Sequence, residues 1–119
     1  MNCLDTYALI EIANGNPSYS NFFNSDFMIN DLTLAEFYWV LIRDYDIDLA
    51  ELWLTNLSPY SQSVDKSILI QAMKYRHENK KQNLSFFDCV GYLFAISKEF
   101  KFVTGDKEFK DKKGVTFIK

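Results

Sequence analysis

Three carboxylates stand alone in apolar stretches of this chain. Asp5, Glu36 and Asp88 are each the only charged residue in a run of at least nine residues. Removing a carboxylate from water is costly, so acids are seldom buried unless a hydrogen bond, a base or a cation compensates the charge. No basic residue lies beside any of the three in the sequence. Something other than a local ion pair must therefore compensate them.

Helix capping is one kind of compensation that fits these positions. Asp and Glu are favoured at helix starts because they accept hydrogen bonds from free backbone N–H groups and oppose the helix dipole. Asp5 lies between an apolar run and a helical pattern. Glu36 follows Thr33, and Asp88 follows Ser85, at the spacing of a capping box. Capping would explain each acid singly.

A divalent cation shared by all of the acids is the other kind of compensation. Parallel strands end at a common edge of their sheet, where ligands bind. Asp5 would stand at that edge, and so would Asp106, which follows the apolar run 102–104. Carboxylate oxygens select hard cations such as Mg²⁺ or Mn²⁺, and acidic metal sites of this kind serve phosphodiester cleavage. On this interpretation Asp5, Glu36, Asp88 and Asp106 form one metal site.

The elements that would position these acids alternate along the chain. Strands are predicted over residues 1–4, 27–29, 100–104 and 115–118. Helices are predicted over residues 7–13, 33–43, 44–57, 65–80 and 85–98, with a loop over residues 30–33. The core-facing residues expected in the fourth helix are Ile68, Leu69, Ala72, Met73 and Tyr75. Such alternation favours an α/β fold with a mainly parallel, Rossmann-like sheet flanked by helices, in a single domain over residues 1–119.

Composition places the chain among globular proteins. Its 119 residues are enough for one domain with a core, and a hydrophobic share of 48% excludes disorder. No apolar run reaches the roughly 18 residues that span a membrane, and no signal-peptide pattern is present. Cys3 and Cys89 lie in apolar runs and are expected to be free, buried thiols. We therefore expect a cytoplasmic protein without a membrane association.

Charge is distributed unevenly. Residues 1–60 hold nine acids and one base, whereas residues 61–119 hold seven acids and twelve bases. A basic half could face a polyanion, although lysines more often solvate a surface. In the acidic half, Leu49, Leu52 and Trp53 lie among acids. They are either core residues or a surface for a partner.

The order of the acidic motifs resembles the PIN-domain ribonucleases, and most closely the VapC-type toxins of toxin–antitoxin pairs. The motifs that carry the resemblance are Asp5-Thr6, Leu34-Ala35-Glu36-Phe37, Asp88, and Thr104-Gly105-Asp106-Lys107-Glu108-Phe109. The chain departs from the family after Asp88, where Gly91, Tyr92 and Phe94 follow in place of mostly small residues.

The resemblance implies a PIN-like fold, a Mg²⁺ or Mn²⁺ site and endoribonuclease activity. It assigns the metal ligands Asp5, Glu36, Asp88 and Asp106, with Thr104 orienting Asp106 or a water. It also implies a homodimer, held inactive by a cognate antitoxin, that acts on RNA. Lys101, Lys107 and Lys110, close to Asp106 in sequence, are expected to contact RNA phosphates.

Two other interpretations remain open. A receiver-like phosphoacceptor domain also gathers acids at strand ends, but it usually has paired acids after its first strand, and Asp5 is unpaired. A PIN-like module could instead bind RNA or a protein without cutting. Such a module has no need of four uncompensated carboxylates.

Overall fold

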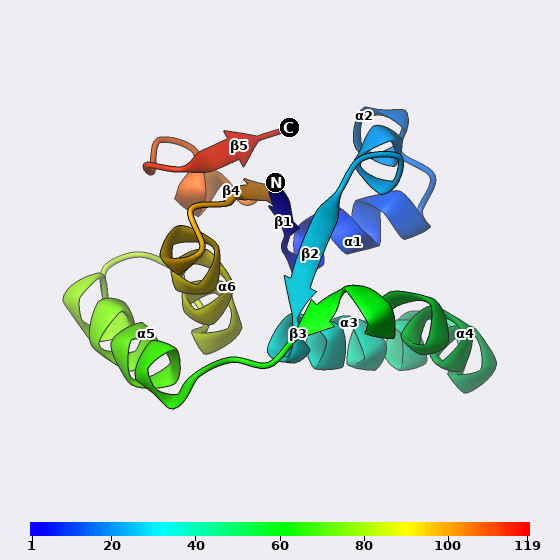
Figure 1. Ribbon diagram of the computed structural model, residues 1–119, viewed down its shortest axis with the longest axis horizontal. Coiled ribbons are helices and arrows are strands. Elements are labelled where there is room, and N and C mark those ends of the chain that lie inside the picture. Colours follow the sequence, from blue (N-terminus) through cyan, green and yellow to red (C-terminus); the bar gives the residue numbers. More distant parts are fainter.

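A five-stranded parallel sheet forms the centre of the molecule. The computed structural model describes residues 1–119, and its sheet has the strand order β3-β2-β1-β4-β5 (Figure 1). The strands are β1 (Asn2–Leu4), β2 (Phe27–Asn30), β3 (Ser61–Gln62), β4 (Lys101–Thr104) and β5 (Val115–Phe117). Every neighbouring pair is parallel, so all strands end at the same edge. The predicted α/β fold with a parallel sheet and flanking helices is therefore confirmed.

Helices cover both faces of this sheet. They are α1 (Thr6–Ala13), α2 (Pro17–Ser20), α3 (Asp31–Asp44), α4 (Ile47–Leu57), α5 (Lys66–Glu78) and α6 (Phe86–Ser97). Successive strand residues point to opposite faces. Leu4 accordingly packs in a core cluster with residues of α1, α3 and α4, whereas Cys3 packs in a second cluster with α5 and α6. Figure 1 shows α5 and α6 together on one side of the strands.

The short central strands account for the apolar sequence around Asp5. β1 is hydrogen-bonded on both sides, to β2 and to β4, and a strand buried on both faces reads as a continuous apolar run. Cys3 and Cys89 are free and buried, as expected. None of the helices has the length and hydrophobicity that crossing a membrane would require.

The predicted loop over residues 30–33 is wrong. α3 begins at Asp31, because the side-chain oxygen of Asn30 accepts hydrogen bonds from the backbone N–H groups of Leu32 and Thr33 (2.8 and 3.0 Å). Asn is among the best residues for this capping position. Thr33 therefore lies inside the helix, and the capping box expected between Thr33 and Glu36 does not form.

Two further sequence predictions are corrected by the packing. Met73 is 53% exposed rather than core-facing, because α5 turns only a narrow stripe with Ile68 and Ala72 toward α6. The strand β3 was not predicted, since its two residues, Ser61 and Gln62, are polar and give no apolar pattern. By contrast, the capping box of Ser85 and Asp88 is present at the start of α6.

Gly105, directly after β4, is held in a space that admits no side chain. An added Cβ atom would lie 2.7 Å from the carbonyl oxygen of Ile118, and closer still to the Tyr7 ring and the Tyr19 hydroxyl. Tyr19 donates a hydrogen bond to that same Ile118 carbonyl. The chain between β4 and Asp106 is therefore fixed by the last residues of the protein.

We expect Gly105→Ala to lower the free energy of unfolding by about 2 kcal/mol or more, because a buried methyl group must displace an aromatic ring and a backbone carbonyl. Gly15→Ala serves as the control. Gly15 has φ of +78° but open space around its Cα, so Ala there should cost only about 1 kcal/mol of backbone strain. Urea denaturation of both variants measures the difference. Equal losses would contradict the steric account of Gly105.

Candidate functional site

Asp5 stands at the C-terminal edge of β1, in the middle of the sheet. Its backbone N–H donates to the Val103 carbonyl of β4 (3.2 Å), and its carboxylate accepts from the backbone N–H of Ala8 (2.8 Å), which caps α1. The side chain is only 8% exposed. The strand and the helix thus fix a buried carboxylate between them.

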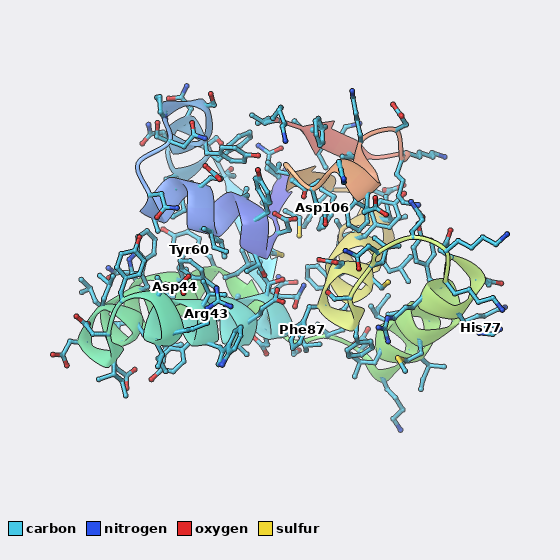
Figure 2. The ribbon with its side chains drawn as sticks, turned by 180° about the vertical axis from the view of Figure 1, so that it is seen from behind. Arg43, Asp44, Tyr60, His77, Phe87 and Asp106 are labelled. Carbon is cyan, nitrogen blue, oxygen red and sulfur yellow. The ribbon has the colours of Figure 1, made fainter.

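Asp106 lies at the same edge, just after the neighbouring strand. The register of β1 and β4 pairs Leu4 with Val103, so Asp5 stands beside Thr104. The Asp106 backbone N–H donates to the Thr104 hydroxyl oxygen (3.0 Å), and the Asp106 carboxylate accepts from the backbone N–H of Glu108 (3.0 Å). Figure 2 shows Asp106 on the chain that leaves β4, above the start of α6.

Asp88 and Glu36 come from helices on opposite sides of this edge. Asp88 is in the first turn of α6, where its carboxylate accepts from the backbone N–H of Ser85 (2.9 Å). Glu36 is in the second turn of α3, and its carboxylate accepts a hydrogen bond from the Thr6 hydroxyl. Capping therefore accounts for Asp5, Asp88 and Asp106, but not for Glu36, which lies beyond the first turn of its helix.

Burial and mutual repulsion disfavour the charged forms of these acids. Burial raises the pKa of Asp5 to about 7; the Thr104 hydroxyl and the Ala8 N–H oppose this shift, and the charges of Asp88 and Asp106 add to it. The pKa of Asp88 is also raised, mainly by burial and then by Asp106. Burial likewise raises the pKa of Glu36, which feels the charge of Asp88. All four carboxylates therefore share one electrostatic neighbourhood.

No cation in the protein neutralises this neighbourhood. The only ion pair in the structure joins Arg43 to Asp44 at 2.8 Å, on the exposed end of α3, away from Asp106 in Figure 2. Sequence analysis expected acids without basic partners, and the structure places no base beside Asp5, Glu36 or Asp88.

The donor chemistry fits a hard cation, although the side chains do not form a coordination sphere. Carboxylate oxygens are the ligands that Mg²⁺ and Mn²⁺ prefer. However, no three His, Cys, Asp or Glu side chains are arranged so that they could hold one ion. The carboxylates of Glu36 and Asp88 accept hydrogen bonds from Thr6 and Ser85 instead.

Asn30 is a polar neighbour of this edge that the sequence did not reveal. The pairing of Cys3 with Met28 sets Asn30, at the end of β2, opposite Asp5. Asn30 is 1% exposed, and its Nδ2 is the one buried side-chain nitrogen or oxygen without a hydrogen-bond partner. Its place at the end of an apolar run, like that of Asp5, was the available signal. The mistaken loop assignment concealed it.

The lysines expected near the acids are separated by the fold. Lys107 lies in the short 3₁₀ turn that follows Asp106, and Lys110 lies directly after that turn; both are exposed. Lys101 begins β4 and pairs with Asn2, so it lies at the opposite end of the strand from Asp106. Only Lys107 and Lys110 therefore lie beside the carboxylate edge.

Comparisons with known proteins agree with this geometry. The sequence profile of the PIN domain matches residues 3–115, and no curated protein matches the chain. The structure is similar to that of Mycobacterium tuberculosis VapC20, a toxin that cleaves the sarcin–ricin loop, at 16% identity, with 97% of each chain covered and a TM-score of 0.83.

Two toxin–antitoxin structures are also similar. A complex from Klebsiella pneumoniae matches at 18% identity, over 98% of this chain and 96% of that chain, with a TM-score of 0.76. DNA-bound VapBC from Salmonella typhimurium matches at 21% identity, over the same shares of the chains, with a TM-score of 0.76. At these identities the likeness establishes a common fold.

The raised pKa of Asp5 predicts a pH dependence of stability. Because folding raises this pKa, the folded state binds the proton more tightly than the unfolded state. The free energy of unfolding should therefore be highest below about pH 4 and fall as the pH rises to about 7. Asp5→Asn retains a capping oxygen but no charge, so it should flatten this decline and be more stable than wild type at pH 8, by about 1–4 kcal/mol.

Asp46→Asn is the matched control, because Asp46 caps α4 in the same way but is exposed. It should leave the pH profile of wild type unchanged. Urea denaturation of the metal-free proteins at pH 4, 6 and 8 measures all three profiles. A profile of Asp5→Asn that declines as steeply as wild type would contradict the assignment to Asp5.

Proposed function

The chain belongs to the PIN-domain family, as the order of its acidic motifs predicted, and on this premise we propose that it is a metal-dependent endoribonuclease. It hydrolyses phosphodiester bonds of RNA and acts as the toxin of a type II toxin–antitoxin pair. The PIN domain is residues 1–119. The single observation that carries this proposal is a set of carboxylates at one sheet edge with no cationic partner in the protein.

The residues of the proposed site have distinct roles. Asp5, Glu36, Asp88 and Asp106 would hold Mg²⁺ or Mn²⁺. When bound, such a cation supplies a Lewis acid that activates water and offsets charge on the phosphate. Thr104 is a positioning residue, because its hydroxyl accepts from the Asp106 backbone and lies near the Asp5 carboxylate.

The buried position of Asp5 gives it a specific part in this site. A carboxylate with its pKa raised to about 7 is only partly ionised at neutral pH. A positive charge beside it favours the ionised form. Cation binding and proton release from Asp5 are therefore coupled, and the site should bind metal more weakly at low pH.

The proposed partners are RNA, a second copy of the chain and a cognate antitoxin. Similar structures from Klebsiella pneumoniae and Salmonella typhimurium contain antitoxins. On α4, Leu52 is 57% exposed, whereas Leu49 and Trp53 are partly covered and pack against the core. Leu52, with Asp48 and Glu51 exposed near it, supports a contact with a basic, amphipathic helix.

Two alternatives fare differently. Membership of the PIN family removes the receiver-like interpretation. A PIN-like module that binds without cutting would have the same fold, and only cleavage assays separate it from a nuclease. The four acids in family order support the nuclease, because a module that does not bind metal would gain stability by replacing Asp5.

We expect Asp5→Asn and Asp88→Asn each to reduce metal-dependent RNA cleavage by at least about a hundredfold, because each removes one anionic ligand. Both variants should remain folded, since Asn also caps helices. Cleavage of a single-stranded RNA with Mg²⁺, with Mn²⁺ and with EDTA measures the loss, and circular dichroism checks the fold.

The control for this loss is Asp46→Asn, a charge change on the exposed start of α4. It should cleave as wild type does. Mg²⁺ or Mn²⁺ at millimolar concentration should also raise the Tm of wild type, because metal binds only the folded state, and should raise that of Asp5→Asn much less. Undiminished cleavage in Asp5→Asn or Asp88→Asn would refute the mechanism.

We expect the double variant Lys107→Ala–Lys110→Ala to raise KM for RNA more than it lowers kcat. Both lysines are exposed beside Asp106, where they would attract phosphates without touching the reacting groups. Lys101→Ala is the control at the opposite end of β4, and its KM should stay near that of wild type. Steady-state kinetics at two salt concentrations measure these changes, and equal effects of Lys101 and the pair would contradict the placement.

A further inference from the structure

We propose that a basic pocket at the C-terminal end of α5 holds a backbone phosphate of the RNA strand, outside the nucleotides that are cut. This inference rests on the proposed function, because it takes RNA as the substrate. The pocket has a volume of about 470 Å³, and the side chains that line it include Arg76, His77, Lys80, Gln82 and Asn83. The site would be selective for the phosphodiester backbone rather than for bases.

The charge of this pocket is unusual for the protein. No acidic residue lines it, although the chain carries a net charge of −3. Arg76 and Lys80 form no ion pair, since the only one in the structure joins Arg43 to Asp44. Cationic side chains without a carboxylate partner, gathered around a concavity, favour an anionic ligand.

Arg76 is held in place rather than free in solvent. Its Nε donates to the Leu84 carbonyl (3.0 Å), which leaves the outer guanidinium nitrogens without a protein partner. A guanidinium group of fixed orientation presents paired donors that match a phosphate. Lys80 makes no hydrogen bond within the protein and can add a second charge from the rim.

The wall of the pocket is tied to the carboxylate edge. Asn83 donates its backbone N–H to the Glu108 carboxylate (2.8 Å), and the Gln82 side-chain amide donates to the Glu108 carbonyl (3.3 Å). Glu108 in turn donates its N–H to Asp106. Lys112 adds a further bond to Gln82 (2.9 Å). Residues that sequence analysis treats as an exposed linker thus form a fixed bridge between the pocket and the proposed metal site.

The pocket lies beside the carboxylates and not over them. In Figure 2, His77 is at the outer end of α5, well to one side of Asp106. A phosphate bound there belongs to a different nucleotide from the one at the acids. Because Gln82 and Asn83 connect the two places through Glu108, the RNA strand would run along this bridge.

Binding assays with a variant that cannot cut separate this inference from the proposed activity. All proteins carry Asp5→Asn, and the probe is a fluorescent single-stranded RNA of about 12 nucleotides with Mg²⁺ present, measured by anisotropy. The test variant adds Arg76→Gln and Lys80→Gln. The control adds Lys66→Gln and Lys74→Gln, which remove the same charge from exposed positions of α5 that do not line the pocket.

We expect the test variant to weaken RNA binding by about 3–10-fold and to reduce the slope of log K against log salt by about 1.4, which is about 0.7 for each lost phosphate contact on a single strand. The control should match the parent in affinity and slope. Because Arg76 also braces Leu84, Lys80→Gln alone is measured as well. It breaks no hydrogen bond and should lower the slope by about 0.7.

Each other outcome overturns the inference. Equal effects of the test and control pairs would mean that only net charge matters. If inorganic phosphate alone, in titration calorimetry, binds the pocket as tightly as the RNA does, the site is a free-anion site. Loss of RNA cleavage is measured separately with Asp5 intact, so a protein that binds RNA through this pocket but never cuts would refute the nuclease and leave the pocket standing.

Discussion

A carboxylate at the buried centre of a parallel sheet is the constraint on which the rest of the structure depends. Asp5 is hydrogen-bonded through its backbone to β4 and through its side chain to α1, so it cannot turn toward solvent without breaking both elements. Its charge is opposed by burial and by Asp88 and Asp106. A fold that retains this arrangement without a base beside it keeps a local instability, of the kind that accompanies functional sites.

The surrounding elements maintain the site through backbone geometry more than through side-chain packing. The parallel register brings the ends of β1 and β4 together, and Gly105 lets the chain pass beneath Ile118 toward Asp106. Tyr19 fastens the C-terminal residues over that passage. Precision at the edge therefore depends on segments that are distant in the sequence.

Much of the fold could be predicted because its local signals agree with one another. The central strands are apolar, and the Ser85–Asp88 capping box starts α6 where the sequence indicates. The predictions that were wrong fall where a local signal had two solutions. Asn30 and Thr33 both suit a helix start, and the Asn30 side chain, buried at the end of β2, takes the cap. Met73 fits a helical apolar stripe, but α6 covers only one side of α5.

The sequence by itself determined which acids lack a local partner, because that property depends on neighbours within a few residues of Asp5, Glu36 and Asp88. Only the tertiary structure decided which charges meet. Lys101 and Asp106 are five positions apart in the sequence but lie at opposite ends of β4. Asn83 and Glu108 are 25 positions apart but are hydrogen-bonded. Strand direction and long-range hydrogen bonds set these distances, and neither can be read from spacing along the chain.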